Sequence, residues 1–367
     1  MRILQIITRM DSIGGAQRHV VELCQAARDA GHEVHLAYGG GCALKEDEVE
    51  GICLHEVGRL GREISLRQDL LAIQELYRLV KRISPDLVAT HSTKAGILGR
   101  LAAAWAKVCN VHTVHGWSVS FSGNALKRFA YRQIESRVHR LADGIICVCT
   151  YDYRHALKMG LKEAKLTVIY NGRPDTSLGV ENKCDVGNPV RIVSVGRMAW
   201  PKQPEQLLSF LVNCAEARLD LLGNGPREEE VKALAKNLGV DDRVVFHGHV
   251  DEVYPVLSRG DIFALVSDWE GFPMSTLEAM AAGLPAVVSH VGGAPEAIRE
   301  GITGYTIPRG DVGMLHERLR ELVEDPEKRV RFGREARAFY ESRFRLETMT
   351  AATLRFYCER VAMQTGR

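Results

Sequence analysis

The stretch DIFALVSDWEGFPMSTLEAMAAGLPAVVS, residues 261–289, decides the fold class of this chain. Its short apolar runs at 262–266 and 286–289 predict two buried strands, and a helix is expected to begin near Met274 between them. Parallel strands are normally joined through a helix. This stretch therefore predicts one strand–helix–strand unit of a parallel sheet.

The same alternation extends outward from this unit. In the second half, strands are expected at 191–195, 219–222, 243–247 and 304–307, with helices at 204–215 and 227–238. In the first half, strands are expected at 3–8, 33–38, 86–90, 111–114, 144–148 and 166–170, and helices at 16–30, 66–83, 97–107 and 126–141. Residues 171–190 are rich in Gly, Pro, Asn and Asp and indicate a linker. The predicted fold is α/β, with two doubly wound Rossmann-like domains facing a cleft.

Length and composition agree with a two-domain enzyme. A chain of 367 residues exceeds the size at which single cores stop growing, and 46% hydrophobic with 26% charged residues argues against disorder. No apolar run is long enough to span a membrane, and the run at 3–8 is too short for a signal peptide. Nine dispersed cysteines favour a reducing cytoplasm, and the absence of finger-like Cys/His spacing argues against zinc.

Charge is distributed unevenly along the chain. The net charge of +2 combines +6 over residues 1–180 (24 basic, 18 acidic) with −4 over the remainder (24 basic, 28 acidic). Between Lys94 and Arg140 there are eight basic residues and one acidic residue, Glu135, with aromatic residues interleaved. Such a patch can bind anionic lipid headgroups or a lipid diphosphate. A solvated basic face is the alternative, and no nucleic-acid recognition motif is present.

The segment from Glu270 to Pro285 is the strongest candidate for chemistry. Glu270 lies in the loop after a strand, and Glu278 is expected in the first turn of the following helix. A helix N-terminus offers free N–H groups to a phosphate or a sugar oxygen, and a carboxylate can accept hydrogen bonds from ribose hydroxyls. The structural alternative for Glu278 is an acid that complements the helix dipole.

Two cations follow the strand at 191–195. In Gly196-Arg197-Met198-Ala199-Trp200-Pro201-Lys202, Arg197 offers a planar fork for phosphate oxygens and Lys202 a mobile point charge. Together they can stabilise the charge that develops on a departing diphosphate without a metal. Solvated surface cations are the alternative.

Two further strand ends carry candidate residues. Gly14 and Gly15 follow the first strand and would let the backbone approach a ligand, although a plain tight turn explains them equally well. His115 follows the strand at 111–114 and can donate to a sugar hydroxyl. A lone histidine is more often a structural hydrogen-bonding group, and His91 and His112 are read in that way.

These motifs together resemble the retaining glycosyltransferases of the GT-B fold, specifically family 4, over essentially the full length. The shared pattern comprises the early Gly-Gly, the His-Gly, Gly-Arg-x₄-Lys, Glu-x₇-Glu, Asn171-Gly172 at the hinge, and the segment from Phe246 to Val250. One departure is visible: the usual Asn-Gly-aliphatic-Asp hinge is here Asn171-Gly172-Arg173-Pro174-Asp175.

The resemblance implies a role for each part of the chain. Residues 1–170 would form the acceptor-side domain, 171–190 the linker, 191–345 the nucleotide-sugar-binding domain, and 346–367 a helix that packs back on the first domain. Arg197 and Lys202 would hold the donor diphosphate and Glu278 the ribose, while Gly15, next to Gly14, closes on the phosphates. Glu270 would hold the transferred sugar, with His115 beside the reacting sugar. The remaining donor contacts would come from Val250 near the base and from Phe272, Pro273, Met274, Ser275 and Leu277.

The resemblance also implies transfer of a sugar from a nucleotide sugar, most often a UDP-sugar, with retained configuration and no metal or other cofactor. The segment around His115-Gly116-Trp117 further resembles enzymes that extend polysaccharide precursors on a polyprenyl diphosphate carrier. A cytoplasmic enzyme docked on the inner leaflet is therefore expected. A nucleotide-sugar epimerase and a non-catalytic sugar-nucleotide-binding protein stay open as alternatives. Paired carboxylates also occur in glycosidases, but a hydrolase would not need the phosphate-binding features.

Overall fold

The computed structural model describes residues 1–61, 63, 65–117, 133–175 and 189–366. The chain forms two compact units, Met1–Asn171 with Leu346–Arg367, and Gly172–Arg345. Each unit contains its own parallel sheet, so the predicted α/β class is confirmed. Most of the predicted linker, 176–188, lies outside the described residues, and the predicted cleft between the domains stays a prediction.

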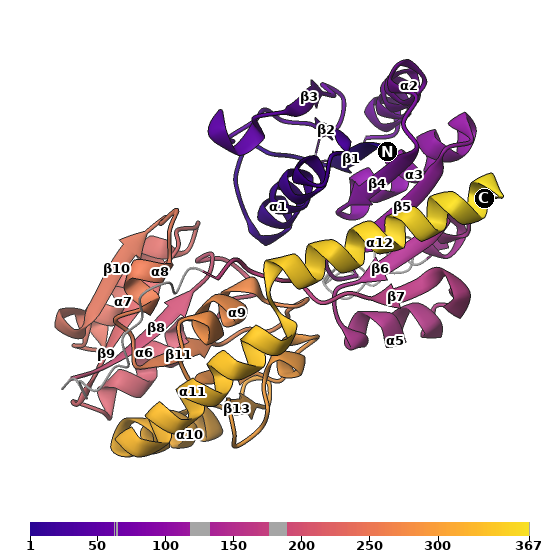
Figure 1. Cartoon of the computed structure of the whole chain (residues 1–367). Helices are drawn as coiled ribbons and strands as arrows, with labels where there is room; N and C mark the ends of the chain where they lie inside the picture. The colour runs from indigo at the N-terminus through magenta and orange to yellow at the C-terminus, as the bar shows by residue number, and fades with distance from the viewer. Residues whose placement is uncertain (62, 64, 118–132, 176–188, 367) are drawn as a thin grey trace. The chain divides into compact units, whose positions relative to one another are not determined.

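The first unit is built on a seven-stranded sheet with the order β3-β2-β1-β4-β5-β6-β7 (Figure 1). Its strands are β1 (Arg2–Ile7), β2 (Glu33–Tyr38), β3 (Ile52–Glu56), β4 (Leu87–His91), β5 (Cys109–Val114), β6 (Gly144–Cys147) and β7 (Leu166–Val168). Its helices are α1 (Gly15–Asp29), α2 (Leu66–Ile83), α3 (Thr93–Ala106), α5 (Thr150–Lys158) and α12 (Leu346–Thr365). The sequence analysis missed β3 and α5. Only residues 133–141 of the helix predicted at 126–141 fall within the described part.

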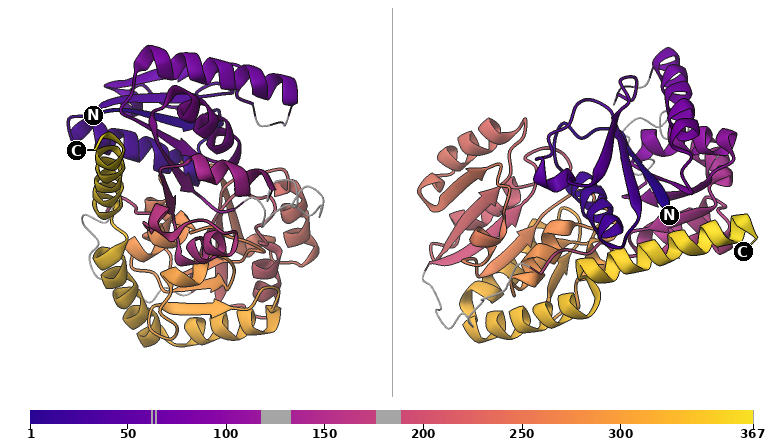
Figure 2. Two further views of the ribbon diagram at one scale, coloured as in Figure 1. Left: turned by 90° about the vertical axis from the view of Figure 1, so that its right-hand side faces the viewer. Right: turned by 45° about the horizontal axis from the view of Figure 1, so that its top comes forward.

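Both faces of this sheet are buried, which explains why its strands are almost continuously apolar. Along β1, Ile3 and Ile7 join a core with residues of α1 and α12, whereas Leu4 and Ile6 join a second core with residues of α2 and α3. The two cores follow from the alternation of side chains along a strand. The helices therefore cover both faces of the sheet (Figure 2).

The second unit is built on a six-stranded sheet with the order β10-β9-β8-β11-β12-β13. Its strands are β8 (Val190–Val195), β9 (Ala217–Leu222), β10 (Val244–Gly248), β11 (Ile262–Leu265), β12 (Ala286–Ser289) and β13 (Gly304–Ile307). Its helices are α6 (Glu205–Val212), α7 (Glu228–Asn237), α8 (Tyr254–Leu257), α9 (Met274–Ala281), α10 (Val312–Glu324) and α11 (Pro326–Arg343). Ile192 of β8 belongs to a core on one face with α6, α7 and α10, and Val193 to a core with α8 and α9.

The aromatic residues Phe332, Phe339, Tyr340, Phe344, Phe356 and Tyr357 of the C-terminal segment are buried. Phe344 lies against Phe272 and Phe339 within the second unit, with ring centroids 5.5 and 5.1 Å apart. Phe356 and Tyr357 of α12 join the core of the first unit, where α12 packs against α1 and β5.

The two strand orders determine where ligands can bind. In each sheet the direction of winding reverses at one point, between β1 and β4 in the first unit and between β8 and β11 in the second. Ligands of open parallel sheets bind outside the carboxyl ends of the strands at such a switch point. The glycine pair follows β1, the Arg197–Lys202 segment follows β8, and Glu270 follows β11. Most of the candidate residues thus lie at switch points.

Two further observations concern the state of the cysteines and the hydrophobicity of the helices. All eight cysteines within the described ranges are free. Among the described helices, none is both long and apolar enough to cross a bilayer.

Candidate active site

Lys202 and Glu270 are brought together at the switch point of the second sheet. The loop after β8 runs antiparallel to the end of β11, with a bridge between Lys202 and Ser267 and a 2.9 Å hydrogen bond from the Gln203 N–H to the carbonyl of Val266. This arrangement carries the Lys202 Nζ to 2.5 Å from Glu270 Oε1. Both side chains are largely enclosed, at 19% and 11% exposure. The sequence analysis selected both residues but did not predict their contact.

Gly196 leaves room for this ion pair. A Cβ atom at Gly196 would lie 3.0 Å from Cε of Lys202, so any larger residue would displace the lysine side chain. Arg197 follows directly, is exposed, and lines the same pocket as Lys202. Within the described part of the chain, Arg197 forms no ion pair with a carboxylate. Its guanidinium is therefore available to an anionic ligand, and its predicted contact with the donor diphosphate stays a prediction.

Helix α9 begins next to this pair. Pro273 is the N-cap and has no N–H, and the helix starts at Met274, as predicted. The amides of Met274 and Ser275 lie in the first turn, where N–H groups have no partner within the helix. Phe272 and Leu277 are buried, at 4% and 0% exposure. The predicted donor contacts of Phe272 and Leu277 stay predictions.

Glu278 forms an ion pair with the residue that departs from the hinge pattern. A guanidinium nitrogen of Arg173 lies 2.9 Å from Glu278 Oε1, and the two side chains are 14% and 19% exposed. The next acid of the hinge, Asp175, forms a bidentate pair with Arg337, at 2.9 and 2.6 Å. Arg173 and Asp175 are thereby held to α9 and α11 of the second unit. The departure at Arg173 thus places a cation on the carboxylate that the resemblance assigns to ribose.

Two glycine loops that the sequence analysis missed complete this edge of the sheet. Gly292, after β12, has φ +55°, and a Cβ atom there would lie 1.8 Å from the carbonyl oxygen of Glu270. Gly223, after β9, has φ +120° and would place a Cβ 2.2 Å from the carbonyl oxygen of Gly196. Only glycine permits these close approaches. The loop of Gly223 packs directly against the segment that leads to Lys202, and the loop of Gly292 packs against the backbone of Glu270.

The end of β10 carries the segment expected to meet the base. Gly248 has φ +65° and its carbonyl accepts a hydrogen bond from the Gly223 N–H at 2.7 Å. His247 Nε2 lies 2.6 Å from Asp220 Oδ1, so this histidine is tied to β9. Val250 packs against the core shared with α8 and α9. Its predicted role in contacting the base stays a prediction.

In the first unit, Gly14 and Gly15 lie at the N-terminus of α1. Both are exposed, and Gly14 is extended at φ −114°, so its backbone conformation does not require glycine. The side chain of Gln17 closes this end of the helix by accepting a hydrogen bond from the Gly14 N–H at 3.3 Å. The absence of a side chain at these positions therefore leaves the helix start accessible.

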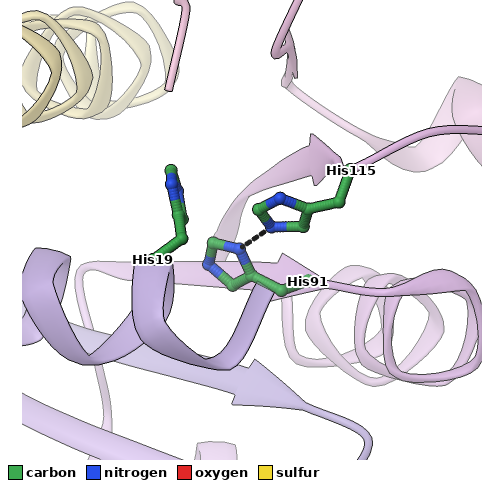
Figure 3. A group of neighbouring side chains, drawn as sticks. All are labelled: His19, His91 and His115. Carbon is green, nitrogen blue, oxygen red and sulfur yellow. Dashed lines mark hydrogen bonds between the residues drawn. The ribbon is translucent and has the colours of Figure 1, made fainter. Parts of the chain in front are cut away.

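His115 belongs to a cluster of three histidines (Figure 3). His91 donates from Nε2 to Gln5 Oε1 at 2.8 Å, and its Nδ1 lies 3.1 Å from His115 Nε2. The ring of His19 stands edge-on to that of His115, with centroids 4.8 Å apart. Desolvation lowers the pKa of all three groups, for His19 to about 4, and keeps them neutral at physiological pH. The structural interpretation of His91 was therefore incomplete, because it contacts His115 directly.

His112, by contrast, is structural, as predicted. It is buried, and its Nδ1 lies 2.9 Å from Thr90 Oγ1 and 3.1 Å from the carbonyl of Thr90. The hinge pair is divided between the units, because the boundary falls between Asn171 and Gly172. Asn171 is buried, and its side chain raises the pKa of His19 against the larger effect of burial.

The basic patch is only partly available to a partner. Arg100 is fully buried, and its Nη2 donates to both carboxylate oxygens of Glu135 at 3.0 Å. Lys94 pairs with Asp69 at 2.6 Å. These two residues are therefore paired within the first unit, and membrane contact of the rest of the patch stays a prediction. Lys127, Arg128 and Arg132, with the aromatic residues around them, lie outside the described residues, whereas Lys107, Arg137 and Arg140 are exposed.

Comparison with known proteins identifies the class. Residues 183–339 match the family Glycosyl transferases group 1, and residues 13–176 match Glycosyltransferase Family 4. The HepE protein of Anabaena, solved with UDP and glucose, matches 98% of this chain and 100% of its own, with a TM-score of 0.85 and 20% identity. The resemblance stated above is therefore confirmed: this chain is a glycosyltransferase of the GT-B fold.

The chain belongs to glycosyltransferase family 4. Among its relatives, the UDP-Gal:alpha-D-GlcNAc-diphosphoundecaprenol alpha-1,3-galactosyltransferase of Escherichia coli is 29% identical over 288 residues, 73% of this chain and 74% of the relative. The N-acetyl-alpha-D-glucosaminyl L-malate synthase of Bacillus anthracis is 27% identical over 366 residues, 94% of each chain.

Proposed function

We propose that this enzyme transfers a sugar from a UDP-sugar to a lipid-linked saccharide, with retention of configuration and without a metal. The observation that carries this proposal is the convergence of Lys202, Glu270 and the start of α9 at one switch point. A cation, a carboxylate and free helix N–H groups are the groups that a sugar diphosphate requires.

In the proposed reaction, the bond between the anomeric carbon and the diphosphate oxygen breaks while the acceptor oxygen attacks from the same face. The acceptor proton passes to the departing phosphate oxygen. Arg197 and Lys202 stabilise the negative charge that develops on the diphosphate, and the α9 amides add their dipoles. These groups supply the positive charge that a metal ion would otherwise provide. The absence of an Asp-x-Asp pair from the sequence agrees with this mechanism.

The remaining residues orient the donor in this proposal. Glu278 accepts hydrogen bonds from the ribose hydroxyls, with Arg173 beside its Oε1, and Glu270 holds the transferred sugar. From the first unit, neutral His115 contacts the reacting sugar. The hydrogen bond with His91 Nδ1 fixes the proton of His115 on Nε2 and leaves Nδ1 as an acceptor.

The substrates are proposed from the relatives. HepE has been solved with UDP, and the name of the Escherichia coli relative specifies a UDP-sugar donor and a diphosphoundecaprenol-linked acceptor. A polyprenyl carrier lies in a membrane, so we place the enzyme in the cytoplasm at the inner leaflet. Exposed Lys107, Arg137 and Arg140, with Trp105 at 56% exposure, provide the cationic and aromatic groups for that contact.

The decisive experiment incubates the protein with UDP-, GDP- and ADP-sugars in EDTA, with and without polyprenyl-diphosphate-linked acetylhexosamine. A transferase of the proposed kind releases UDP only when the acceptor is present, and the product keeps the anomeric configuration of the donor. Acceptor-independent conversion of the sugar would indicate an epimerase, and UDP-sugar binding without turnover would indicate a binding protein. Loss of activity in EDTA that Mg²⁺ restores would contradict the metal-independent mechanism.

A further inference from the structure

The histidine cluster of the first unit has the composition of a metal site. His19 comes from α1, His91 is the last residue of β4, and His115 follows β5. One ring nitrogen from each lies within 4.8 Å of the others. Figure 3 shows the three rings converging from separate elements. Residues far apart in sequence are thus held together by the pairing of β4 with β5 and by the packing of α1 against this sheet.

The position of His91 is fixed as in known metal sites. Its Nε2–H donates to Gln5 Oε1 at 2.8 Å, so its Nδ1 carries the lone pair, which is directed at His115. Metal-binding histidines usually donate their second N–H to an oxygen in this way. Zinc–nitrogen bonds of about 2.0–2.1 Å in a tetrahedral site place two ligand nitrogens about 3.3–3.4 Å apart. The observed separation of 3.1 Å between His91 Nδ1 and His115 Nε2 is close to that value.

His19 adds the third imidazole. It is 3% exposed, and within the described residues neither of its ring nitrogens makes a hydrogen bond of normal length and angle. The Asn171 side chain raises the pKa of this imidazole, but burial lowers it by more. A buried imidazole without a good hydrogen bond lowers stability, and a bound metal ion would satisfy it. His115 is partly buried, whereas His19 and His91 are buried.

We propose that His19, His91 and His115 bind one zinc ion, with the fourth position open to water or to an anionic ligand. Binding requires the Nε2 proton of His115 to move to Nδ1, and the metal then takes the place of that proton between the two rings. Three nitrogen ligands suit zinc, whereas magnesium and calcium require oxygen ligands.

The site has a consequence that rests on the proposed function. Metal bound to His115 removes that side chain from the reacting sugar, so zinc inhibits transfer. The proposed catalysis remains metal-independent, because the groups assigned to the diphosphate belong to the second unit. The three histidines thus make the enzyme sensitive to free zinc.

Cobalt(II) tests the site without reference to activity. Titration of the metal-free, reduced protein with Co²⁺ is expected to give the visible absorption of one tetrahedral ion with nitrogen ligands, which Zn²⁺ then displaces. His19→Ala is expected to weaken Co²⁺ binding by more than the roughly 10- to 100-fold caused by loss of an outer-shell partner. Gln5→Ala, which removes the outer partner of His91, is expected to fall within that range.

His55→Ala is the matched control. His55 Nε2 lies 2.9 Å from His35 Nδ1 in the same unit, so this variant removes one member of a histidine pair outside the cluster. Co²⁺ binding in this variant should equal that of the unaltered protein. Circular dichroism and thermal melting establish that each variant is folded.

The proposal is overturned by the absence of a tetrahedral Co²⁺ spectrum in the folded protein, by unchanged binding in His19→Ala, or by a thiolate charge-transfer band showing that exposed cysteines hold the ion. UDP binding measured in EDTA is a separate readout. Its loss would count against the proposed function, whereas the Co²⁺ spectrum alone decides the metal site.

Discussion

Arg173 and Glu278 form an ion pair at 2.9 Å, in which a hinge residue neutralises the carboxylate proposed to hold the donor ribose. Both side chains are less than one fifth exposed, so the pair is shielded from solvent. The contact of Arg173 with Oε1 of Glu278 holds the Glu278 side chain in place. The cation at this hinge position therefore orients the site in this chain.

Glu278→Ala is expected to weaken UDP binding by about 1.5–3 kcal/mol, the range for hydrogen bonds to a charged group. The variant removes the ribose acceptor and leaves the Arg173 guanidinium without this partner. Isothermal titration with UDP measures the change. Glu317→Ala, at a side chain that is 66% exposed, is the control and should bind UDP normally. Equal affinities in the two variants would refute the ribose assignment.

Lys202→Met is expected to lower kcat by about 10²–10³-fold, because the charge on the departing diphosphate loses a preorganised cation. Steady-state UDP release in the presence of acceptor measures this effect. Lys232→Met removes a lysine that pairs with Glu228 and Glu229 on the surface of α7 and should leave kcat unchanged. A Lys202→Met enzyme with normal turnover would show that this lysine serves only to pair with Glu270.

Glu135→Gln is expected to destabilise the first unit by about 3–5 kcal/mol, because it leaves the fully buried Arg100 guanidinium without a counter-charge. A lower melting temperature of the first unit measures this loss, and a second substitution, Arg100→Met, should recover much of it. Arg137→Met, at an exposed position of the same segment, should change the melting temperature little. No shift in Glu135→Gln would mean that water reaches Arg100.

Glu321 predicts a pH-dependent contribution to the stability of the second unit. Burial raises the pKa of this carboxyl, but hydrogen bonds from Lys328, Tyr305 and Arg318 outweigh burial and lower the pKa to about 2. Because the pKa of Glu321 is lower in the folded state than the unfolded-state value of about 4.3, the ionised carboxylate stabilises the fold at pH values above about 4.3. This stabilisation is lost as the pH falls toward 2. Glu321→Gln should therefore lower the melting temperature at neutral pH and converge with the unaltered protein near pH 2. Glu324→Gln, at 67% exposure, should follow the unaltered protein throughout.

Membrane contact is expected to depend on charge and on salt. The protein should float with vesicles that contain anionic lipid at low ionic strength and should detach at high salt, because screening weakens the attraction. Replacing Arg137 and Arg140 together by Gln should reduce the bound fraction. Flotation with neutral vesicles is the control, and an absence of binding to anionic vesicles at low salt would remove the proposal.

Local sequence patterns determined the fold class and most of the candidate residues. The apolar runs and the helix start at Met274 can be recognised from local sequence. Strand–helix alternation then permits few arrangements other than parallel sheets. The strand Ile52–Glu56 was missed because it lies at the edge of the sheet and exposes much of its surface, which removes the continuous apolar signal. The short motifs lie at the predicted ends of strands, which is where ligands of parallel sheets bind.

Only the tertiary structure decided which of those residues meet. Lys202 and Glu270 are 68 positions apart, and Gln5, His91 and His115 lie on or directly after three different strands, so no local pattern could pair them. The departure at Arg173 was visible in the sequence, but its partner Glu278 was not. Sequence periodicity reports which face of an element is buried, whereas contacts between elements depend on strand order and on the close approaches that Gly196, Gly223 and Gly292 allow.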